Sequence, residues 1–213
     1  MNRRQRKKQL KMKNKKLVKR YPWLLPKNVW TDKLDKDYDY TYTLADCFPE
    51  GWRKAFFEEM HEELREELIK YNYLDEFRVM QIKEKYGMLR YYVGSTPKDS
   101  KIHDIIDKYE YISQFICLDC GKLDVPVIDD GWLTPICESC YNKRKNRQKQ
   151  WYESHGYKYN EDFVPTYEKL LENVDYDYTL KDYYKIERSS PGSDWETITI
   201  DISDTVEKLR KKG

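Results

Sequence analysis

Four cysteines are arranged as two C-x-x-C pairs, a pattern that can bind a metal ion. Cys117 and Cys120 form the first pair, Cys137 and Cys140 form the second, and sixteen residues separate the pairs. Each pair presents two thiolates on one tight turn, and two such turns can close the tetrahedron of ligands that Zn²⁺ prefers. The spacing therefore predicts one structural zinc ion bound by these four residues.

The same cysteines would form two disulfides only in an oxidising compartment. The sequence starts with MNRRQRKKQL, and no apolar segment follows these charges. Because a secretory signal needs such a segment, we expect a cytoplasmic protein with reduced thiols. The fifth cysteine, Cys47, has no C-x-x-C partner, and we expect it to be a small buried residue.

The residues that most often carry catalysis form no recognisable constellation. The histidines His61, His103 and His155 fall in three separate predicted helices. In HEELR, Arg65 occupies the position of the second histidine of a zincin motif. HNH-type nucleases need a histidine between their two knuckles, and that interval here reads VPVIDDGWLTP. We therefore expect no enzymatic activity and no small-molecule substrate, with a nuclease-related enzyme as an alternative.

Charge is distributed unevenly along the chain. Residues 1–20 contain eleven Lys or Arg and no acid, whereas the rest has 29 basic and 38 acidic residues, a net charge of −9. The few apolar positions in residues 1–20 predict a disordered tail. Such a tail can bind a polyanion, fold back on the acidic body or reach an acidic partner.

A second basic segment follows Cys140 and contains no acid until Glu153. Its five cations would repel one another on a helix. Phosphates could offset them, with Trp151 and Tyr152 stacking on bases, and so could the acidic body. The residues that we predict to contact nucleic acid are Arg3, Arg4, Arg6, Lys7, Lys8, Lys143, Arg144, Lys145, Arg147 and Lys149.

Several elements are expected before the first cysteine pair. Residues 21–30, YPWLLPKNVW, contain two prolines and predict an extended strap packed on a surface. Tyr38, Tyr40 and Tyr42 recur with period two, as in a strand. A helix capped by Asp46 is expected from Pro49 onwards. Its core stripe has a spacing of four, widened by Phe57 and Ile69, and consists of Trp52, Phe56, Met60, Leu64 and Leu68.

The remaining elements surround and follow the cysteines. A hairpin over residues 77–93, closed at Gly87, and a helix over residues 100–116 lead into the CLDCGK turn. A short hairpin is expected at 125–135, followed by a helix whose first turn holds the second cysteine pair. Beyond residue 155 we expect a helix at 165–174, a hairpin around 189–194 and a short basic helix at the end of the chain.

These elements predict an α+β fold, in which helices pack on a small antiparallel hairpin beside a treble-clef-like zinc lobe. The predicted segments are a disordered basic tail (1–20), an α+β core (21–116), a zinc lobe with a basic helix (117–155) and a C-terminal α/β extension (156–213). The longest apolar run falls far short of the ~20 residues that span a bilayer. No membrane association is therefore expected.

Four motifs together resemble a group of small phage and prophage proteins of unassigned function. They are QIKEKYGMLRYYV at 81–93, the isoleucine-rich helix after it, CLDCGK, and GWLTPICESC. The resemblance covers about residues 21–141. It implies an origin in a mobile element, a location inside the host cell and a zinc lobe, and it implies nothing about activity.

The sequence leaves two binding functions open. The first is a zinc-stabilised protein that binds nucleic acid through the basic tail and the helix after the second cysteine pair. The alternative is a phage-encoded inhibitor, of the anti-defence or anti-CRISPR kind, that binds a host protein through acidic, tyrosine-rich segments. Its predicted contact residues are Tyr38, Tyr40, Tyr176 and Tyr178.

Overall fold

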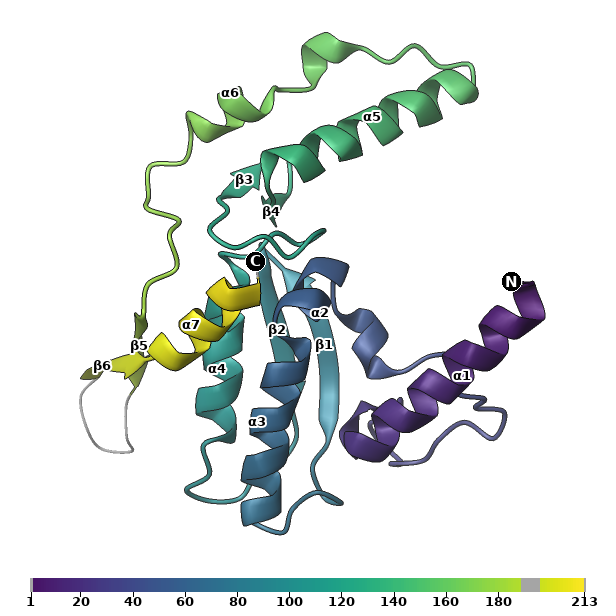
Figure 1. The fold of residues 1–213 in the computed structure, drawn as a ribbon, viewed down its shortest axis with the longest axis vertical. Coiled ribbons are helices and arrows are strands. Elements are labelled where there is room, and N and C mark those ends of the chain that lie inside the picture. The colour runs from purple at the N-terminus through teal and green to yellow at the C-terminus, as the bar shows by residue number, and fades with distance from the viewer. Residues whose placement is uncertain (1, 189–195, 213) are drawn as a thin grey trace. The chain divides into compact units, whose positions relative to one another are not determined.

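A computed structural model describes residues 2–188 and 196–212, and within them the protein is α+β with three two-stranded antiparallel sheets (Figure 1). The chain divides into two compact units, and each takes residues from separate parts of the sequence. The first unit comprises Met1–Pro49, Phe56–Lys85 and Leu89–Tyr109. The second comprises Glu50–Ala55, Tyr86–Met88 and Glu110–Gly213.

The basic N-terminal segment forms a helix, so the expected disordered tail is not confirmed. Helix α1 spans Arg3–Arg20 and begins with a capping box, in which Asn2 and Gln5 exchange side-chain and backbone hydrogen bonds. One side of α1 packs on the first unit: Val18 is buried, and Asn14 Nδ2 donates to the carbonyl of Tyr40 at 2.9 Å. The periodicity of apolar residues did not predict this packing, because the buried residues of α1 are one apolar side chain, Val18, and one polar side chain, Asn14.

The segment after α1 differs from the predicted extended strap. Residues Pro22–Leu24 form the 3-10 helix η1, in which Trp23 and Leu24 are buried as expected. Trp30, by contrast, is 91% exposed at the tip of a loop. The period-two tyrosines 38, 40 and 42 lie in turns and bends, not in a strand.

The predicted single helix from Pro49 is two helices. Helix α2 spans Glu50–Ala55 and α3 spans Phe57–Lys70, because Phe56 leaves the helical region with φ −139° and ψ 2°. Asp46, predicted as the cap of this helix, forms a capping box with Thr43 at the start of the 3-10 helix η2 (Leu44–Cys47). The expected core stripe is confirmed, since Trp52, Phe56, Met60, Leu64 and Leu68 are all fully buried. Ile69 does not widen it, because 46% of Ile69 is exposed.

The predicted hairpin and second helix of the first unit are both present. Strands β1 (Val79–Lys85) and β2 (Met88–Val93) are joined by Tyr86 and Gly87, whose φ angles of 57° and 74° fit a tight hairpin turn. Helix α4 spans Ile102–Ser113. It is tied to α3 through Glu63, which accepts hydrogen bonds from Lys108 and from the Tyr109 hydroxyl.

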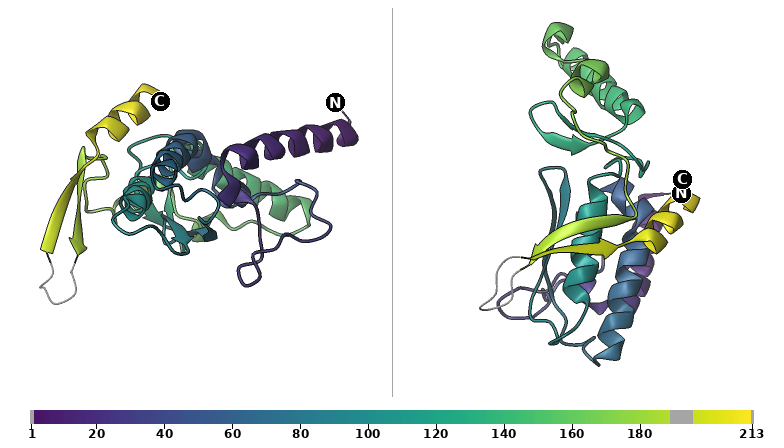
Figure 2. Two further views of the ribbon diagram at one scale, coloured as in Figure 1. Left: turned by 90° about the horizontal axis from the view of Figure 1, so that it is seen from below. Right: turned by 90° about the vertical axis from the view of Figure 1, so that its left-hand side faces the viewer.

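The second unit contains the cysteine pairs and everything after them. A hairpin of β3 (Val127–Asp129) and β4 (Leu133–Pro135) leads into the long helix α5 (Glu138–Ser154). The 3-10 helix η3 (Glu161–Phe163) and α6 (Tyr167–Leu171) follow. The chain ends with a hairpin of β5 (Tyr183–Arg188) and β6 (Glu196–Asp201), then α7 (Ser203–Lys212) (Figure 2). The turn expected at 189–194 lies outside the described residues.

None of the helices in the described ranges is both long enough and apolar enough to cross a membrane.

His61 is a fully buried member of the aromatic core of the first unit. Its Nδ1 lies 2.7 Å from the carbonyl of Phe57, and its Nε2 lies 3.2 Å from the Tyr91 hydroxyl. Its ring stacks on Trp23 at an interplanar angle of 8°. Because burial disfavours the imidazolium, the pKa of His61 falls to about 4, against an opposing contribution from its contact with Phe57. The ring is therefore neutral in the folded protein at pH 7.

We expect this buried ring to make the protein less stable in mild acid. In the unfolded chain His61 takes up a proton near pH 6.5, whereas the folded state resists protonation down to about pH 4. The stability contributed by the neutral ring is thus lost as pH falls from about 6.5 to 4, by about 2 kcal/mol at pH 4.5. Urea unfolding of the wild type and of His61→Phe at pH 7 and pH 4.5 measures this loss, because both proteins share every other titrating group. Equal pH dependence in the two proteins would contradict it.

Candidate metal centre

The four cysteine sulfurs converge on one point of the second unit. Their Sγ atoms all lie within 4.8 Å of one another, and those of Cys120 and Cys137 are 3.8 Å apart. A tetrahedron with Zn–S bonds of about 2.3 Å has edges of about 3.8 Å. Cys117, Cys137 and Cys140 are buried and Cys120 is exposed. The predicted convergence is confirmed, and the four thiolates could hold one metal ion such as zinc.

The first cysteine pair lies on a turn closed by its own backbone. Cys117 N donates to the carbonyl of Lys122 at 2.8 Å, and Gly121 N donates to the carbonyl of Cys117 at 2.9 Å. Gly121 has a φ of +88°, in the left-handed region that favours glycine. This is the conformation expected from the C-x-x-C-G sequence, and it brings both sulfurs of the pair to one side of the turn.

The second cysteine pair lies at the start of α5, as predicted. Cys137 is the residue preceding the first turn, and its amide donates to Cys117 Sγ at 3.5 Å. Cys140 follows within that turn. The positive end of the helix dipole acts in favour of the thiolate, but at Cys140 burial and the neighbouring thiols outweigh it. One helix terminus and one tight turn thus supply the four ligands.

Helix α2 packs against the first cysteine turn through a glycine. A Cβ atom on Gly51 would lie 2.0 Å from the carbonyl oxygen of Cys117, a distance that no side chain can tolerate. Gly51 N also donates to the carbonyl of Leu118 at 2.9 Å, and Trp52 Nε1 donates to the carbonyl of Ile116 at 3.0 Å. Sequence reasoning missed this contact, for which the only signal is a glycine inside an otherwise strongly helical segment.

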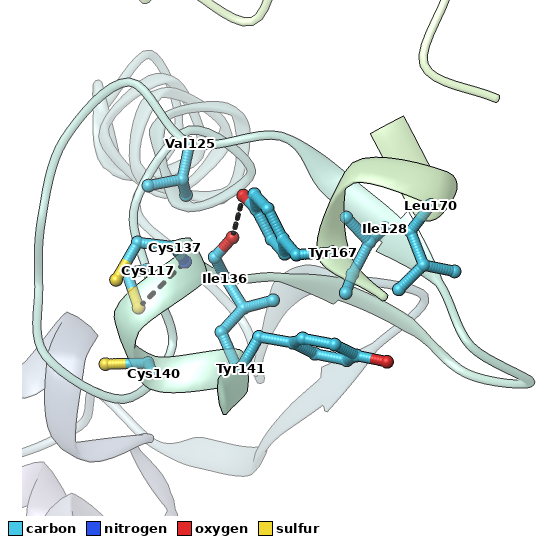
Figure 3. Packing of buried hydrophobic residues seen from close by; sticks show 9 residues of the cluster. All are labelled: Cys117, Val125, Ile128, Ile136, Cys137, Cys140, Tyr141, Tyr167 and Leu170. Carbon is cyan, nitrogen blue, oxygen red and sulfur yellow. Dashed lines mark hydrogen bonds between the residues drawn. The ribbon is translucent and has the colours of Figure 1, made fainter. Parts of the chain in front are cut away.

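A small apolar cluster lies behind the sulfurs (Figure 3). Its members come from the first cysteine turn, from the β3–β4 hairpin and the residues flanking it, from α5 and from α6: Cys117, Val125, Ile128, Ile136, Cys137, Cys140, Tyr141, Tyr167 and Leu170. Tyr167 fixes α6 on this cluster by donating its hydroxyl hydrogen to the carbonyl of Ile136 at 2.9 Å. Residues beyond 155, predicted as a C-terminal α/β extension that packs on the core, contribute Tyr167 and Leu170 to the packing around the cysteine cluster.

The protein environment affects the thiols unequally. Burial acts to raise the pKa of Cys117, but backbone amides of Cys137, Cys120 and Asp119 point at this sulfur, and its pKa lies below the ordinary value. Burial and its neighbouring thiols raise the pKa of Cys140 well above the usual range. A bound metal cation would favour the thiolate form of every member of the set.

Three of the five cations predicted to contact nucleic acid on α5 interact with the second unit itself. Arg144 makes a two-pronged ion pair with Asp119, at 2.7 and 2.5 Å, which joins α5 to the first cysteine turn. Lys149 pairs with Glu161 at 2.5 Å. Lys145 donates to the carbonyl of Pro165 at 2.9 Å. Acidic groups of the protein itself, one of the two alternatives, therefore neutralise Arg144 and Lys149, and Lys145 is held by a backbone carbonyl.

Lys143 and Arg147 differ from those three. Both are exposed, and within the described part of the chain neither makes an ion pair or a hydrogen bond through its side chain. Trp151 lies one turn further along the same face and is 53% exposed. Its ring stacks on His155 at 4.4 Å between centroids and is nearly parallel to Tyr157. The result is a stripe of two cations and a stacked aromatic group.

The cations of α1 are divided in the same way. Lys7 and Lys11 pair with Asp39, and Lys15 lies 5.0 Å from the centre of the Tyr40 ring. The remaining predicted contacts of the tail, Arg3, Arg4, Arg6 and Lys8, are exposed.

The tyrosines predicted to bind a protein partner contact other parts of the chain. Tyr38 and Tyr40 pack on each other at 4.9 Å between ring centroids, and Tyr38 donates to the carbonyl of Tyr42. The hydroxyl of Tyr176 donates to the carbonyl of Val127 at 3.4 Å and accepts from its amide at 2.9 Å. Tyr178 is 36% exposed. Cys47, expected to be buried, is half-buried, with its sulfur 2.9 Å from the Tyr42 hydroxyl.

Comparisons with protein-family models, with curated proteins and with solved structures found no match to this chain.

Removal of one ligand should abolish metal binding. Structural zinc contributes about 10 to 16 kcal/mol of apparent binding free energy, and this lobe has only a small apolar cluster besides. We expect Cys117→Ser and Cys140→Ser each to lose zinc and unfold the lobe, as measured by elemental analysis and amide hydrogen exchange. Cys47→Ala is the control and should retain one zinc per chain. A zinc-free wild type, or a folded Cys117→Ser protein, would refute the assignment.

A methyl group at Gly51 should disturb the metal centre from outside the ligand set. In Gly51→Ala the new Cβ collides with the Cys117 carbonyl, so α2 or the cysteine turn must move. Overpacking of this kind costs about 1 to 3 kcal/mol, and we expect faster zinc loss to a chelator and a lower melting temperature. The matched control is Gly94→Ala, whose Cβ meets no atom closer than 3.8 Å. Equal behaviour of the two variants would contradict the role given to Gly51.

Proposed function

We propose that this is a non-enzymatic protein whose zinc-bound lobe presents α5 to nucleic acid. The observation that carries the proposal is the stripe of Lys143, Arg147 and Trp151, which recur every fourth residue and so share one face of the helix. Cations that have no partner among the described residues are available for phosphates, and an exposed indole is available for a base.

The composition of this stripe favours single strands over duplexes. Two cations can neutralise only two phosphates, whereas a protein that spans a groove of duplex DNA contacts about 6 to 10 of them. A stack of Trp151, His155 and Tyr157 offers a flat aromatic surface, and stacking on such a surface needs bases that are not already stacked in a helix. The outer face of α1, with Arg6, Lys13 and Lys16 exposed, would add a second sequence-independent contact.

The surroundings of the three histidines support a role without catalysis. His61 is enclosed by aromatic rings, and His155 stacks on Trp151. The Nε2 of His103 lies 3.3 Å from the Thr96 hydroxyl. None of the three histidines belongs to the group of side chains that could bind the metal ion, which consists of the four cysteines.

The proposal also covers the metal and the lobe. We assign the metal as one structural zinc ion, because four thiolates at tetrahedral spacing suit zinc and leave no position for a substrate. The order of cysteine turn, hairpin and helix supports a treble-clef-like lobe. The origin in a phage or mobile element, and the location inside its host cell, stay predictions from the sequence resemblance.

Binding to a fluorescent single-stranded oligonucleotide, measured over a range of salt concentrations, tests the function. Each phosphate contact contributes about 0.7 to the slope of log affinity against log salt for single strands. We expect the double variant Lys143→Ala/Arg147→Ala to lower the slope by about 1.4. Trp151→Ala should weaken binding by about 1 to 3 kcal/mol without changing the slope, because it removes stacking and no charge.

Lys185→Ala/Lys208→Ala is the matched control, since it removes two exposed cations of the same unit that lie outside α5. If this control lowers the slope as much as the α5 variant, binding is a property of net charge and the site on α5 is wrong. If the wild type shows no salt-dependent binding near 0.1 M salt, the nucleic-acid function itself fails.

A further inference from the structure

A cavity of about 570 Å³ lies beside the first cysteine turn, within the second unit. Its volume is within the range of about 300 to 1,000 Å³ that is typical of small-molecule sites. Four basic side chains and one carboxylate line it: Lys54, Lys122, Arg210, Lys212 and Asp124. The apolar part of its lining comes from Ala55, Ile116, Leu123 and Leu209.

We propose that this cavity binds a phosphorylated small molecule of the nucleotide class. Cations outnumber acids four to one around it, which selects for an anion. The apolar side chains would accommodate the part of the ligand that carries no charge. Such a site is separate from the stripe on α5, because the cavity lining includes no residue of that helix.

Two of the four lining cations, Lys122 and Arg210, remain available to a ligand, whereas Lys54 pairs with Glu50 at 2.6 Å and Lys212 donates to the carbonyl of Ala55. The side chain of Lys122 is exposed and makes no ion pair within the described residues. Arg210 uses Nη2 to donate to the carbonyl of Leu180 at 3.0 Å, which holds the guanidinium in place, and among the described residues Arg210 makes no ion pair. The carboxylate of Asp124 already accepts a hydrogen bond from the amide of Leu180 at 2.8 Å. The backbone of Leu180 therefore holds Arg210 in place through its carbonyl and uses one hydrogen-bonding position of Asp124 through its amide.

Three elements of the second unit fix the cavity walls. Helix α2 is pressed against the cysteine turn at Gly51, which places Lys54 and Ala55 beside Cys120 and Gly121. Helix α7 closes the other side, and Lys212 Nζ donates to the carbonyl of Ala55 at 3.2 Å. A cavity bounded by a metal-fixed turn and two helices needs little rearrangement to bind its ligand, which lowers the entropic cost of binding.

The cations have one other possible role, which the experiment must separate from ligand binding. Four thiolates around a divalent metal carry a net charge of −2, and Cys120 also lines the cavity. Basic groups nearby would stabilise that charge even if nothing entered the cavity. A variant that weakened zinc binding but not ligand binding would reveal this role.

Isothermal titration of the zinc-loaded full chain with ADP, pyrophosphate and adenosine tests the proposal. We expect ADP to bind most tightly, pyrophosphate more weakly and adenosine not at all, because the phosphates provide the main attraction and the nucleoside adds apolar contact. Lys122→Ala should weaken ADP binding by about 10-fold to 100-fold, the range for a lost charged hydrogen bond, with an unchanged zinc content. Lys185→Ala, which removes an exposed cation of the same unit outside both the cavity and α5, is the control and should leave ADP binding unchanged.

Four results would overturn the proposal. They are no heat of binding at about 1 mM ADP, pyrophosphate binding as tight as ADP, equal weakening by Lys185→Ala and Lys122→Ala, or a loss of zinc in Lys122→Ala with ADP affinity unchanged. The oligonucleotide assay is a separate measurement on α5. Either proposal can therefore fail while the other stands.

Discussion

The convergence of four sulfurs from two distant turns is the constraint on which the second unit depends. The residues around them form an apolar cluster of nine side chains, three of which are the cysteines themselves. So small a cluster provides limited hydrophobic stabilisation, and a metal ion bound by the four cysteines would hold the turn and the helix start together and supply what the cluster lacks. The positions of α5, α6 and α2 then follow from contacts with that turn and hairpin: Arg144 with Asp119, Tyr167 with Ile136, and Gly51 with Cys117.

Intramolecular pairing separates the basic residues into two groups. On α5, three cations bind acids or carbonyls of their own unit, and the other two align with Trp151. On α1, Lys7 and Lys11 face Asp39 in a segment rich in acids and tyrosine. Exposed ion pairs contribute about 0 to 1 kcal/mol each, so these pairs order their segments only together with buried contacts such as those of Val18 and Asn14. The candidate contacts for polyanions are the cations that remain.

Several differences between the predicted and observed elements share one physical cause. Periodicity reports which residues face a core, and it predicted the buried stripe of α2 and α3 correctly. It does not report where the backbone leaves the helix, as at Phe56, nor where a loop holds an aromatic residue in solvent, as at Trp30. That residues 3–20 form a packed helix was also not predicted, because polar contacts with residues more than twenty positions away in the chain stabilise α1.

The sequence by itself determined the chemistry of the metal centre and most of the local structure around it. Cysteine spacing, a glycine after the first pair and a helical segment after the second pair are local features, so they can be read from neighbouring residues. Tertiary structure alone decided which cations remain unpaired, how closely α2 approaches the cysteine turn, and that a cavity forms where α2, the turn and α7 meet. Each of these depends on residues far apart in the chain, and a local pattern carries no information about the distance between them.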